Sequence, residues 1–240
     1  TGKNITERDG AVNAHIKDGI AMCRFLRWFD EEAPKGGLTE MDAVRKIDEF
    51  RADNPLYRGE SFATIAASGK NAAYIHYHTS EKNNAPIKPD AMFLIDTGAQ
   101  YLDGTTDITR TIAVGNVSAL EKKRYTQVLK GHIAIATIAF PEGTTGSQLD
   151  ILARQFLWRD GVDYAHGTGH GVGSYLSVHE GPQRIARGSS RIALMPGMLI
   201  SNEPGYYKAD AFGIRLENVV MVEPLPPTEG SEIKTLGLST

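Results

Sequence analysis

The sequence predicts an α+β fold in which one succession of elements occurs twice. Two helical patterns are followed by short strands and an acidic hairpin, and this order returns in the second part of the chain without obvious sequence repetition. Helices and strands grouped in this way are typical of α+β domains. We therefore expect two similar helix-helix-sheet halves, whose acidic hairpins lie symmetrically about a shared centre.

The composition suits one domain with a sizeable core. The 240 residues are 41% hydrophobic, carry a formal net charge of −3 and contain no long basic run. We expect a single domain, with neither nucleic acid nor a membrane as a partner, because no apolar run approaches the roughly 20 residues of a membrane span. The single cysteine, Cys23, falls in a helical pattern. It suggests a core thiol and a reducing, cytoplasmic location.

The helices are predicted from apolar periodicity and capping residues. Thr6, Thr39 and Thr145 precede apolar stripes as helix-capping residues do, and glycine or proline residues follow the stripes. We expect helices at 6–29, 39–51, 118–140 and 145–160.

Short runs rich in β-branched and aromatic residues predict the strands. Turn residues separate these runs. We expect strands at 62–67, 73–77, 91–95, 107–112, 198–202 and 214–222. The second of these would end near His76.

The first acidic hairpin brings two carboxylates together. Asp96 follows the buried-looking strand 91–95, and Asp107 begins the return strand. A loop centred near Tyr101 would place Asp96 opposite Asp107, whereas an Asp-Gly turn at 103–104 shifts the register, so the pairing stays open. Two carboxylates this close raise one another's pKa unless a cation lies between them, which indicates a metal site. An ordinary hairpin with an acidic turn is the alternative.

The second acidic hairpin follows the same logic. Glu203 directly follows the strand 198–202 and precedes Pro204 and Gly205, and Glu217 lies on the returning strand. A buried glutamate bears a desolvation cost, so its position in a strand favours pairing with a cation. Solvent-facing glutamates on an edge strand are the alternative, which the presence of two similar hairpins disfavours.

Three histidines lie in and after a glycine-rich segment, HGTGHGVG, between the two acidic hairpins. They are His166, His170 and His179. The segment lacks the glutamate that a zincin helix requires, and its glycines do not have the spacing of a dinucleotide-binding loop. The glycines suggest backbone that passes close to a ligand, with His170 free to bind a metal and the other two histidines free to contact a substrate.

The acids and one imidazole form an oxygen-rich set of candidate metal ligands. The set consists of Asp96, Asp107, His170, Glu203 and Glu217. By ligand type it suits two hard or borderline divalent ions, bridged by carboxylates and a water. We expect Mn²⁺, with Co²⁺ or Zn²⁺ as alternatives.

Four segments carry a family resemblance: DTGAQYLDGTTDITRT, HGTGHGVGSYLSVHEGP, SNEPGYY and GIRLENVV. On these segments the chain resembles the catalytic domain of the Xaa-Pro aminopeptidases, in the long-form aminopeptidase P branch of the pita-bread metallopeptidases. The segments occur in family order between residues 93 and 222. The resemblance implies a pseudo-symmetric pita-bread fold, a dinuclear metal site, and removal of an N-terminal residue that precedes proline.

By motif position, the resemblance also implies a role for each metal ligand. Asp96 would chelate one metal, and Asp107 and Glu217 would bridge both. His170 and Glu203 would bind the other metal. Glu203 would also accept the proton of the bridging water.

The resemblance further implies which side chains support the reaction. His76, His166 and His179 match histidines that surround the metals and bind substrate, and His179 would stabilise the tetrahedral oxyanion. Arg215 and Tyr207 match residues that support the ligands from behind.

The resemblance covers one part of a longer family pattern. Long-form members carry further domains before this region and continue beyond it, so we expect residues 1–240 to be a single catalytic domain from a longer multi-domain chain. A homodimer of that longer chain stays open. The expected substrates are peptides with proline at the second position.

Three alternatives to an aminopeptidase P stay open. The first two keep the metals but change the substrate, as in prolidases and methionine aminopeptidases. The third is a pita-bread binding module that has lost its site. The pairing of HGTGHGVG with VHEGP favours aminopeptidase P, and the retention of all five ligand types disfavours a binding module.

Overall fold

The computed structural model describes residues 2–188 and 191–240, and the expected alternation of helical and strand blocks is confirmed. The α-helices are α1 (Ile5–Glu32), α2 (Glu40–Ala52), α3 (Ala119–Ala136) and α4 (Gly146–Trp158), with short 3₁₀ helices η1 (Ala33–Lys35) and η2 (Gly69–Ala73). The strands of the first half are β1 (Tyr57–Glu60), β2 (Ile65–Ser68), β3 (Ala91–Thr97), β4 (Ala99–Tyr101), β5 (Gly104–Thr105) and β6 (Ile108–Val114). Those of the second half are β7 (Phe140–Pro141), β8 (Gly169–Gly171), β9 (Glu180–Ile185), β10 (Leu199–Asn202), β11 (Gly205–Lys208), β12 (Phe212–Arg215), β13 (Glu217–Pro224) and β14 (Thr235–Ser239).

The main antiparallel sheet is arranged symmetrically about the contact between β6 and β13. Its order is β2-β3-β6-β13-β10-β8-β9, with β14 beside β13 and β7 beside β14. Each half contributes a long hairpin, β3–β6 or β10–β13, and each hairpin contains a smaller pair, β4–β5 or β11–β12. The two halves join where Thr109 pairs with Glu217. The predicted duplication is therefore confirmed at the level of topology.

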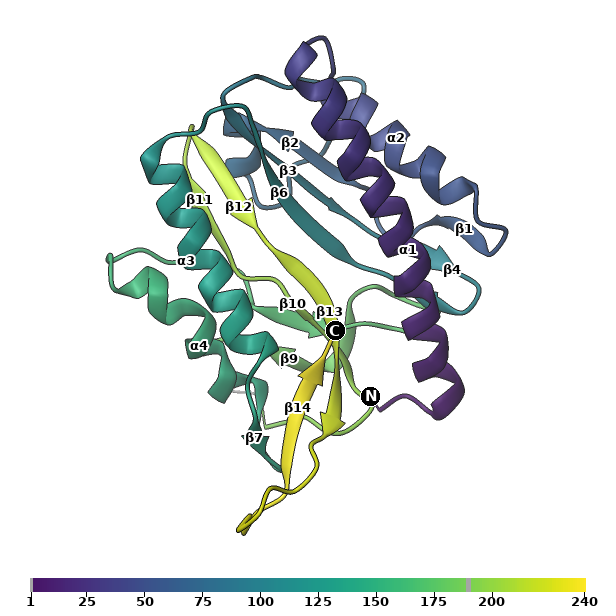
Figure 1. Ribbon diagram of the computed structural model, residues 1–240, viewed down its shortest axis with the longest axis vertical. Helices are drawn as coiled ribbons and strands as arrows, with labels where there is room; N and C mark the ends of the chain where they lie inside the picture. The colour runs from purple at the N-terminus through teal and green to yellow at the C-terminus, as the bar shows by residue number, and fades with distance from the viewer. Residues whose placement is uncertain (1, 189–190) are drawn as a thin grey trace.

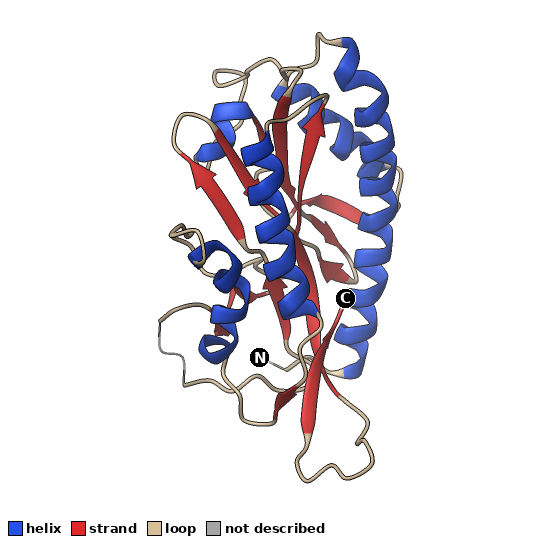
Figure 2. Cartoon of the chain, turned by 60° about the vertical axis from the view of Figure 1, so that its left-hand side comes forward, coloured by secondary structure: helices blue, strands red, loops and turns tan. Residues whose placement is uncertain are grey.

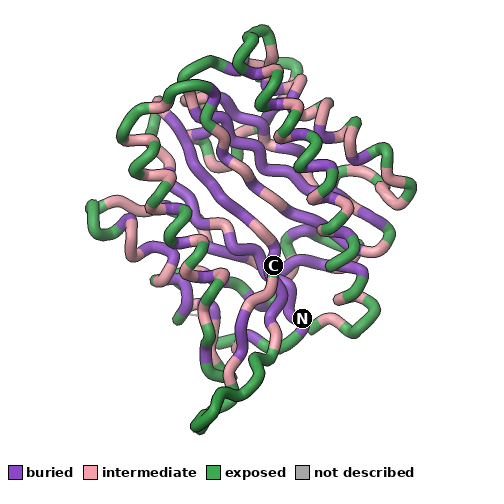
Figure 3. The backbone as a smooth tube through the Cα atoms, viewed as in Figure 1, coloured by how far each residue is buried: buried purple, intermediate pink, exposed green. Residues whose placement is uncertain are grey.

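Each half of the sheet has its own pair of helices. α1 and α2 pack beside β2, β3 and β6, whereas α3 and α4 lie with the second half (Figures 1 and 2). In the first core the rings of Phe29 and Phe93 stack at 4.6 Å, and in the second Ile135 and Leu149 pack with Ile200. The strands are mostly buried while the outer helical surfaces are exposed (Figure 3). These two cores hold the sheet rigid where its hairpins meet.

The helix boundaries differ from the prediction by one to four residues, and α1 ends at Glu32 instead of residue 29. α1 begins at Ile5 because Asn4, rather than Thr6, is the N-cap and forms a capping box with Glu7. α3 ends at Ala136 instead of residue 140, since Phe140–Pro141 is extended and pairs with β14. The capping boxes predicted at residues 39 and 145 are confirmed.

The strand predicted at 73–77 is wrong. The segment follows the 3₁₀ helix η2, and its backbone closes turns through N–H bonds from Tyr74 to Asn71 and from Tyr77 to Tyr74. His76 therefore lies in an exposed turn and does not end a strand. Turn hydrogen bonds between near neighbours prevail here over the strand propensity of the aromatic and β-branched side chains.

Three further predictions concern the burial of Cys23, the strands, and membrane-spanning helices. Cys23 is exposed rather than a core thiol. The strand predicted at 62–67 begins only at Ile65, and the one predicted at 214–222 is divided between β12 and β13. The strands that were not predicted are β1, β4, β5, β7, β8, β9, β11 and β14. Among the helices of the described residues, none combines the length and the apolar character needed to cross a lipid bilayer.

Candidate metal centre

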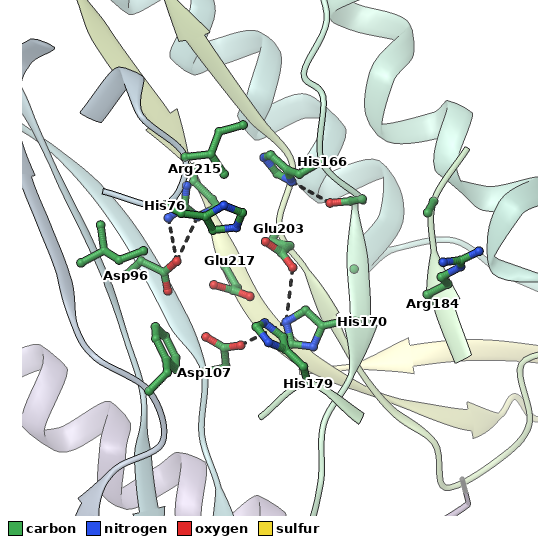
Figure 4. Close-up of a pocket in the computed structure, with 16 residues that line it drawn as sticks. His76, Asp96, Asp107, His166, His170, His179, Arg184, Glu203, Arg215 and Glu217 are labelled. Carbon is green, nitrogen blue, oxygen red and sulfur yellow. Dashed lines mark hydrogen bonds and ion pairs between the residues drawn. The ribbon is translucent and has the colours of Figure 1, made fainter. Parts of the chain in front are cut away.

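The four predicted acids gather where the two long hairpins meet. Asp96 lies on β3 and Asp107 directly precedes β6, while Glu203 directly follows β10 and Glu217 is the first residue of β13. All four line one cavity of about 360 Å³ together with His170 of β8 (Figure 4). The strands deliver these side chains from five separate places in the chain to one point.

The register of the first hairpin is now defined. Asp96 pairs with Thr109 in the β3–β6 ladder, so Asp107 lies beyond the end of the ladder rather than directly opposite Asp96. The turn itself belongs to the small β4–β5 pair, in which Tyr101 faces Gly104. Both carboxylates nevertheless reach the same cavity.

His170 is oriented for metal binding by its second ring nitrogen. Its Nδ1 lies 2.9 Å from the Gly171 carbonyl, so this nitrogen carries the proton and donates. The free Nε2 faces Asp107 Oδ2 at 3.3 Å and Glu203 Oε1 at 3.4 Å. Ligand atoms of Asp107, His170 and Glu217 all lie within 4.8 Å of one another.

Hydroxyl groups hold both glutamates of the site in place. Ser201 donates its Oγ–H to Glu203 Oε1 at 3.0 Å, and Ser201 Oγ accepts the backbone N–H of His170 at 2.9 Å. Thr109 donates to Glu217 Oε2 at 2.6 Å. These bonds fix the carboxylates but supply no positive charge.

Only one carboxylate oxygen of Asp96 contacts a positive charge, the guanidinium of Arg215. Its Oδ2 accepts Nη2 of Arg215 at 2.6 Å and Nε at 3.2 Å. Its Oδ1 is buried and has no hydrogen-bond partner among the described residues. A buried acceptor without a hydrogen-bond partner destabilises the fold, so we expect a ligand from outside the protein to bind this oxygen.

The remaining acids are buried without a full countercharge. Burial raises the pKa of Asp107 well above its usual range, and the charges of Asp96 and Glu203 raise it further. Burial also raises the pKa of Glu217 well above its usual range, with Asp107 as the next cause. The pKa of Glu203 is raised by burial, although His170 acts in the opposite direction. A cluster of acids of this kind is expected to bind cations strongly.

The donor set fits divalent metals. Carboxylate oxygens and one imidazole nitrogen are typical ligands of Mn²⁺, Co²⁺ and Zn²⁺, and the unpartnered Asp96 Oδ1 supplies a further donor. In the described part of the chain, Asp107 and Glu217 form no ion pair with lysine or arginine. A metal would therefore neutralise charges that the protein leaves uncompensated.

A chain of hydrogen bonds connects Arg215 to His166. Arg215 Nη1 donates to the Tyr207 hydroxyl at 2.7 Å, and this hydroxyl donates to His166 Nε2 at 2.7 Å. His166 Nδ1 lies 2.7 Å from the Gly167 carbonyl and donates to it. Burial lowers the pKa of His166 to about 4 and raises that of Tyr207 to about 12, so the imidazole is neutral at pH 7.

The other two predicted histidines line the same cavity. The ring of His179 lies edge-on to that of His170, with centroids 4.3 Å apart, and burial lowers the pKa of His179. His76 reaches the cavity from its turn after η2 (Figure 4). All the predicted ligands and histidines, together with Arg215, are thus brought together, and Tyr207 supports them through its hydroxyl.

Sequence reasoning missed several contributors to the cavity. Phe62, Ile65 and Ile75 supply the apolar wall of this cavity, and Arg184 also lines it. Ser201 was also missed, although a hydroxyl two residues before Glu203 could have been recognised, because alternate residues of a strand share a face. The apolar wall carried no such signal, since its residues were assigned to strands.

Comparison with known proteins identifies the family of this chain. Residues 10–224 match the model of Metallopeptidase family M24. A protein of Tuber melanosporum named Probable Xaa-Pro aminopeptidase P is 51% identical over 224 residues, which cover 92% of this chain and 36% of that protein. The chain thus spans little more than a third of the length of this relative.

Solved structures show the same fold. The X-prolyl aminopeptidase of Caenorhabditis elegans, described as a cytosolic enzyme with a di-nuclear active site, superposes with a TM-score of 0.94 at 40% identity, over 99% of this chain and 39% of that one. A Xaa-Pro dipeptidase of Bacillus anthracis gives a TM-score of 0.81 at 29% identity, over 97% of this chain and 61% of that one. The expected pita-bread α+β fold is confirmed, and the chain belongs to the metallopeptidase family M24.

Proposed function

We propose that this chain is the catalytic domain of a metallo-aminopeptidase that hydrolyses the N-terminal Xaa-Pro bond of peptides. The observation that carries the proposal is the group of Asp107, His170 and Glu217, whose ligand atoms lie within 4.8 Å of one another and whose two acids are buried. It occurs in a chain that is 51% identical to a protein named Probable Xaa-Pro aminopeptidase P. The proposal treats residues 1–240 as one domain.

Two divalent ions would occupy the centre, and we propose Mn²⁺. Asp96 would bind one ion through the oxygen that Arg215 leaves free. Asp107 and Glu217 would bridge both ions, and His170 and Glu203 would bind the second. When bound, the two ions would lower the pKa of a shared water and polarise the scissile carbonyl.

Glu203 would act as the general base. Its carboxylate lines the cavity with Oε1 3.4 Å from Nε2 of His170, where it would accept a proton from a water. Ser201 holds one of its oxygens at 3.0 Å, so the carboxylate has a defined direction. The same residue would later return the proton to the leaving amine.

The histidines would bind the peptide around the scissile bond. His179 would donate to the oxyanion, and His166 would bind the peptide backbone as a neutral imidazole. His76, on an exposed turn, would contact the substrate from the side of the first half. Arg215 and Tyr207 would keep Asp96 and His166 in their orientations through the bonds described above.

The proposed setting is the cytosol, and the proposed partners are peptides with proline at the second position. The related Caenorhabditis elegans enzyme is described as cytosolic, which supports this location. We further propose a homodimer of the longer chain.

The direct test is hydrolysis of Xaa-Pro-Yaa peptides by the purified chain. We expect release of the first residue, loss of activity after chelation, and recovery with Mn²⁺. Peptides with alanine at the second position serve as the control and should be cleaved far more slowly. A metal-loaded chain that cleaves neither series would contradict the proposal.

A dipeptidase acting on free Xaa-Pro is the second candidate. It is favoured by the likeness to the Bacillus anthracis dipeptidase, with a TM-score of 0.81. Rates on Xaa-Pro and Xaa-Pro-Yaa decide between the two, because an aminopeptidase P should prefer the longer peptide.

A further inference from the structure

A buried arginine of α4 holds the backbone that carries His166. Arg154 is 1% exposed. Its guanidinium donates to the carboxylates of Asp150 at 2.7 Å and Asp163 at 2.9 Å. It also donates to the main-chain carbonyls of Tyr164 at 2.7 Å and His166 at 2.8 Å. Two of the four acceptors belong to the backbone, so this side chain defines the path of the segment.

The same network extends to Glu203. Thr168 donates its hydroxyl to Asp150 Oδ1 at 2.6 Å, and the Tyr164 hydroxyl lies 2.5 Å from the same Thr168 oxygen. The Thr168 carbonyl accepts the backbone N–H of Glu203 at 2.8 Å. The loop of residues 164–168 is therefore attached at one end to α4, through Arg154, and at the other end to the backbone of Glu203, the proposed base.

Stability alone does not require this arrangement. A buried ion pair is a weak source of stability, because the desolvation of both charges offsets their attraction. Apolar side chains would fill the space between α4 and the loop at lower cost. What they cannot supply is a rigid fork of N–H donors aimed at two carbonyls.

We infer that Arg154 is a positioning residue for the proposed reaction, and that it acts by fixing the backbone of His166. With the carbonyl of His166 held, its ring keeps the bond to Tyr207 and lies at the cavity (Figure 4). The effect on turnover rests on the proposed function. The effect on the imidazole does not.

Three variants test the inference. Arg154→Met removes all the donors, and Arg154→Lys keeps the charge but not the fork. Asp163→Asn is the matched control, because it removes the charge of an ion-pair partner of Arg154 whose side chain is 24% exposed. It replaces no donor of Arg154, and the amide keeps an oxygen for the backbone N–H of Tyr164, which Asp163 Oδ1 accepts at 2.8 Å.

Two measurements are made on each metal-loaded variant. The first is kcat and KM for an Xaa-Pro-Yaa peptide with Mn²⁺. The second is the ¹⁵N spectrum of the imidazoles with Zn²⁺, in which the His166 signals are assigned by their absence in His166→Asn. Metal content is determined in parallel.

For both Arg154 variants we expect unchanged metal content, altered His166 nitrogen signals, and a loss in kcat that approaches 10²-fold in Arg154→Met. Asp163→Asn should keep the wild-type signals and remain within about threefold in kcat. If Arg154→Met does not fold, Arg154→Lys against Asp163→Asn decides.

Wild-type His166 signals in a folded Arg154 variant would overturn the inference. So would an equal loss in Asp163→Asn, or a loss of metal in Arg154→Lys. An inactive wild-type chain with altered His166 signals in the Arg154 variants would contradict the proposed function but support the role of Arg154.

Discussion

Buried carboxylates in this protein are of two kinds, and the difference between them locates the site. Asp18 is 2% exposed and faces Arg51, whose Nε lies 2.8 Å from Oδ1. Asp107 and Glu217 are 3% and 2% exposed, yet within the described residues no lysine or arginine pairs with them. Equal burial is thus compensated in one region and not in the other.

The comparison shows that burial alone does not distinguish a structural acid from a functional one. Asp18 has its countercharge within the fold, and Tyr101 adds a hydrogen bond at 3.2 Å. Burial raises the pKa of both Asp107 and Glu217, and the charge of Asp107 raises that of Glu217 further. Their arrangement is favourable only when a cation from outside joins them.

The largest effect is expected when the ion pair between Asp18 and Arg51 is broken. Arg51→Met should destabilise the fold by about 3–5 kcal/mol, because it leaves Asp18 buried without its cation. Arg51 also donates to Thr97 Oγ1 at 2.6 Å, so this bond is lost as well. Urea unfolding of the metal-free chain measures the change. A loss below about 1 kcal/mol would show that the pair is not what holds Asp18 in place.

The next effect concerns an acid of the uncompensated group. Glu203→Gln keeps the shape and an oxygen donor but cannot accept a proton, so kcat should fall by about 10² or more, or about 2.7 kcal/mol in the barrier. KM should change less. Near-normal turnover in a metal-replete variant would remove Glu203 from the role of base.

A third change should raise the stability of the fold, whereas Arg51→Met should lower it. In the metal-free chain Asp107→Asn removes a buried, repelled charge, so stability at pH 8 should rise by on the order of 1 kcal/mol. Metal affinity should fall at the same time. Destabilisation of the metal-free variant would mean that the protein compensates Asp107 in another way.

The same charges give the metal-free chain a characteristic pH dependence. For an acid whose pKa is raised by folding, the folded state binds more protons than the unfolded state above the unfolded pKa, which lies near 4. Stability of the metal-free chain should therefore decrease as the pH rises from about 4 to 8. Metal binding requires the deprotonated acids, so the stabilisation by Mn²⁺ should increase over the same range. Parallel curves for the two forms would contradict the assignment.

The smallest effect is expected from a residue that touches no metal ligand directly. Tyr207→Phe removes the hydroxyl between Arg215 and His166 but leaves Arg215 on Asp96. Metal content should stay at the wild-type level, and kcat should fall by roughly tenfold or less. Substantial metal loss in this variant would make Tyr207 part of the support of Asp96.

The convergence of the acids could be predicted from the sequence because its signal is local. Asp96 and Glu203 each follow an apolar run and precede turn residues, and both lie near strand ends in the structure. Glu217 lies in a β-branched run that does form β13. Strand ends in an antiparallel hairpin are close in space, so a local pattern was enough to bring the carboxylates together.

Other features depend on contacts that no local pattern records. His76 was assigned to a strand because its neighbours are aromatic and β-branched, whereas a 3₁₀ turn decides its position. β8 was not predicted, since its glycines have low strand propensity and it exists through pairing with β9 and β10. The acceptors of Arg154 include two carbonyls, which any residue would provide.

The number of metal ions bound per chain tests the central claim most directly. The chain is equilibrated with Mn²⁺, freed of excess metal and analysed for its metal content, beside Asp107→Asn and Glu217→Gln. We predict two ions in the wild type and a marked loss in both variants, because each carboxylate would hold both ions. A wild-type chain without bound metal, or variants that keep both ions, would contradict the account.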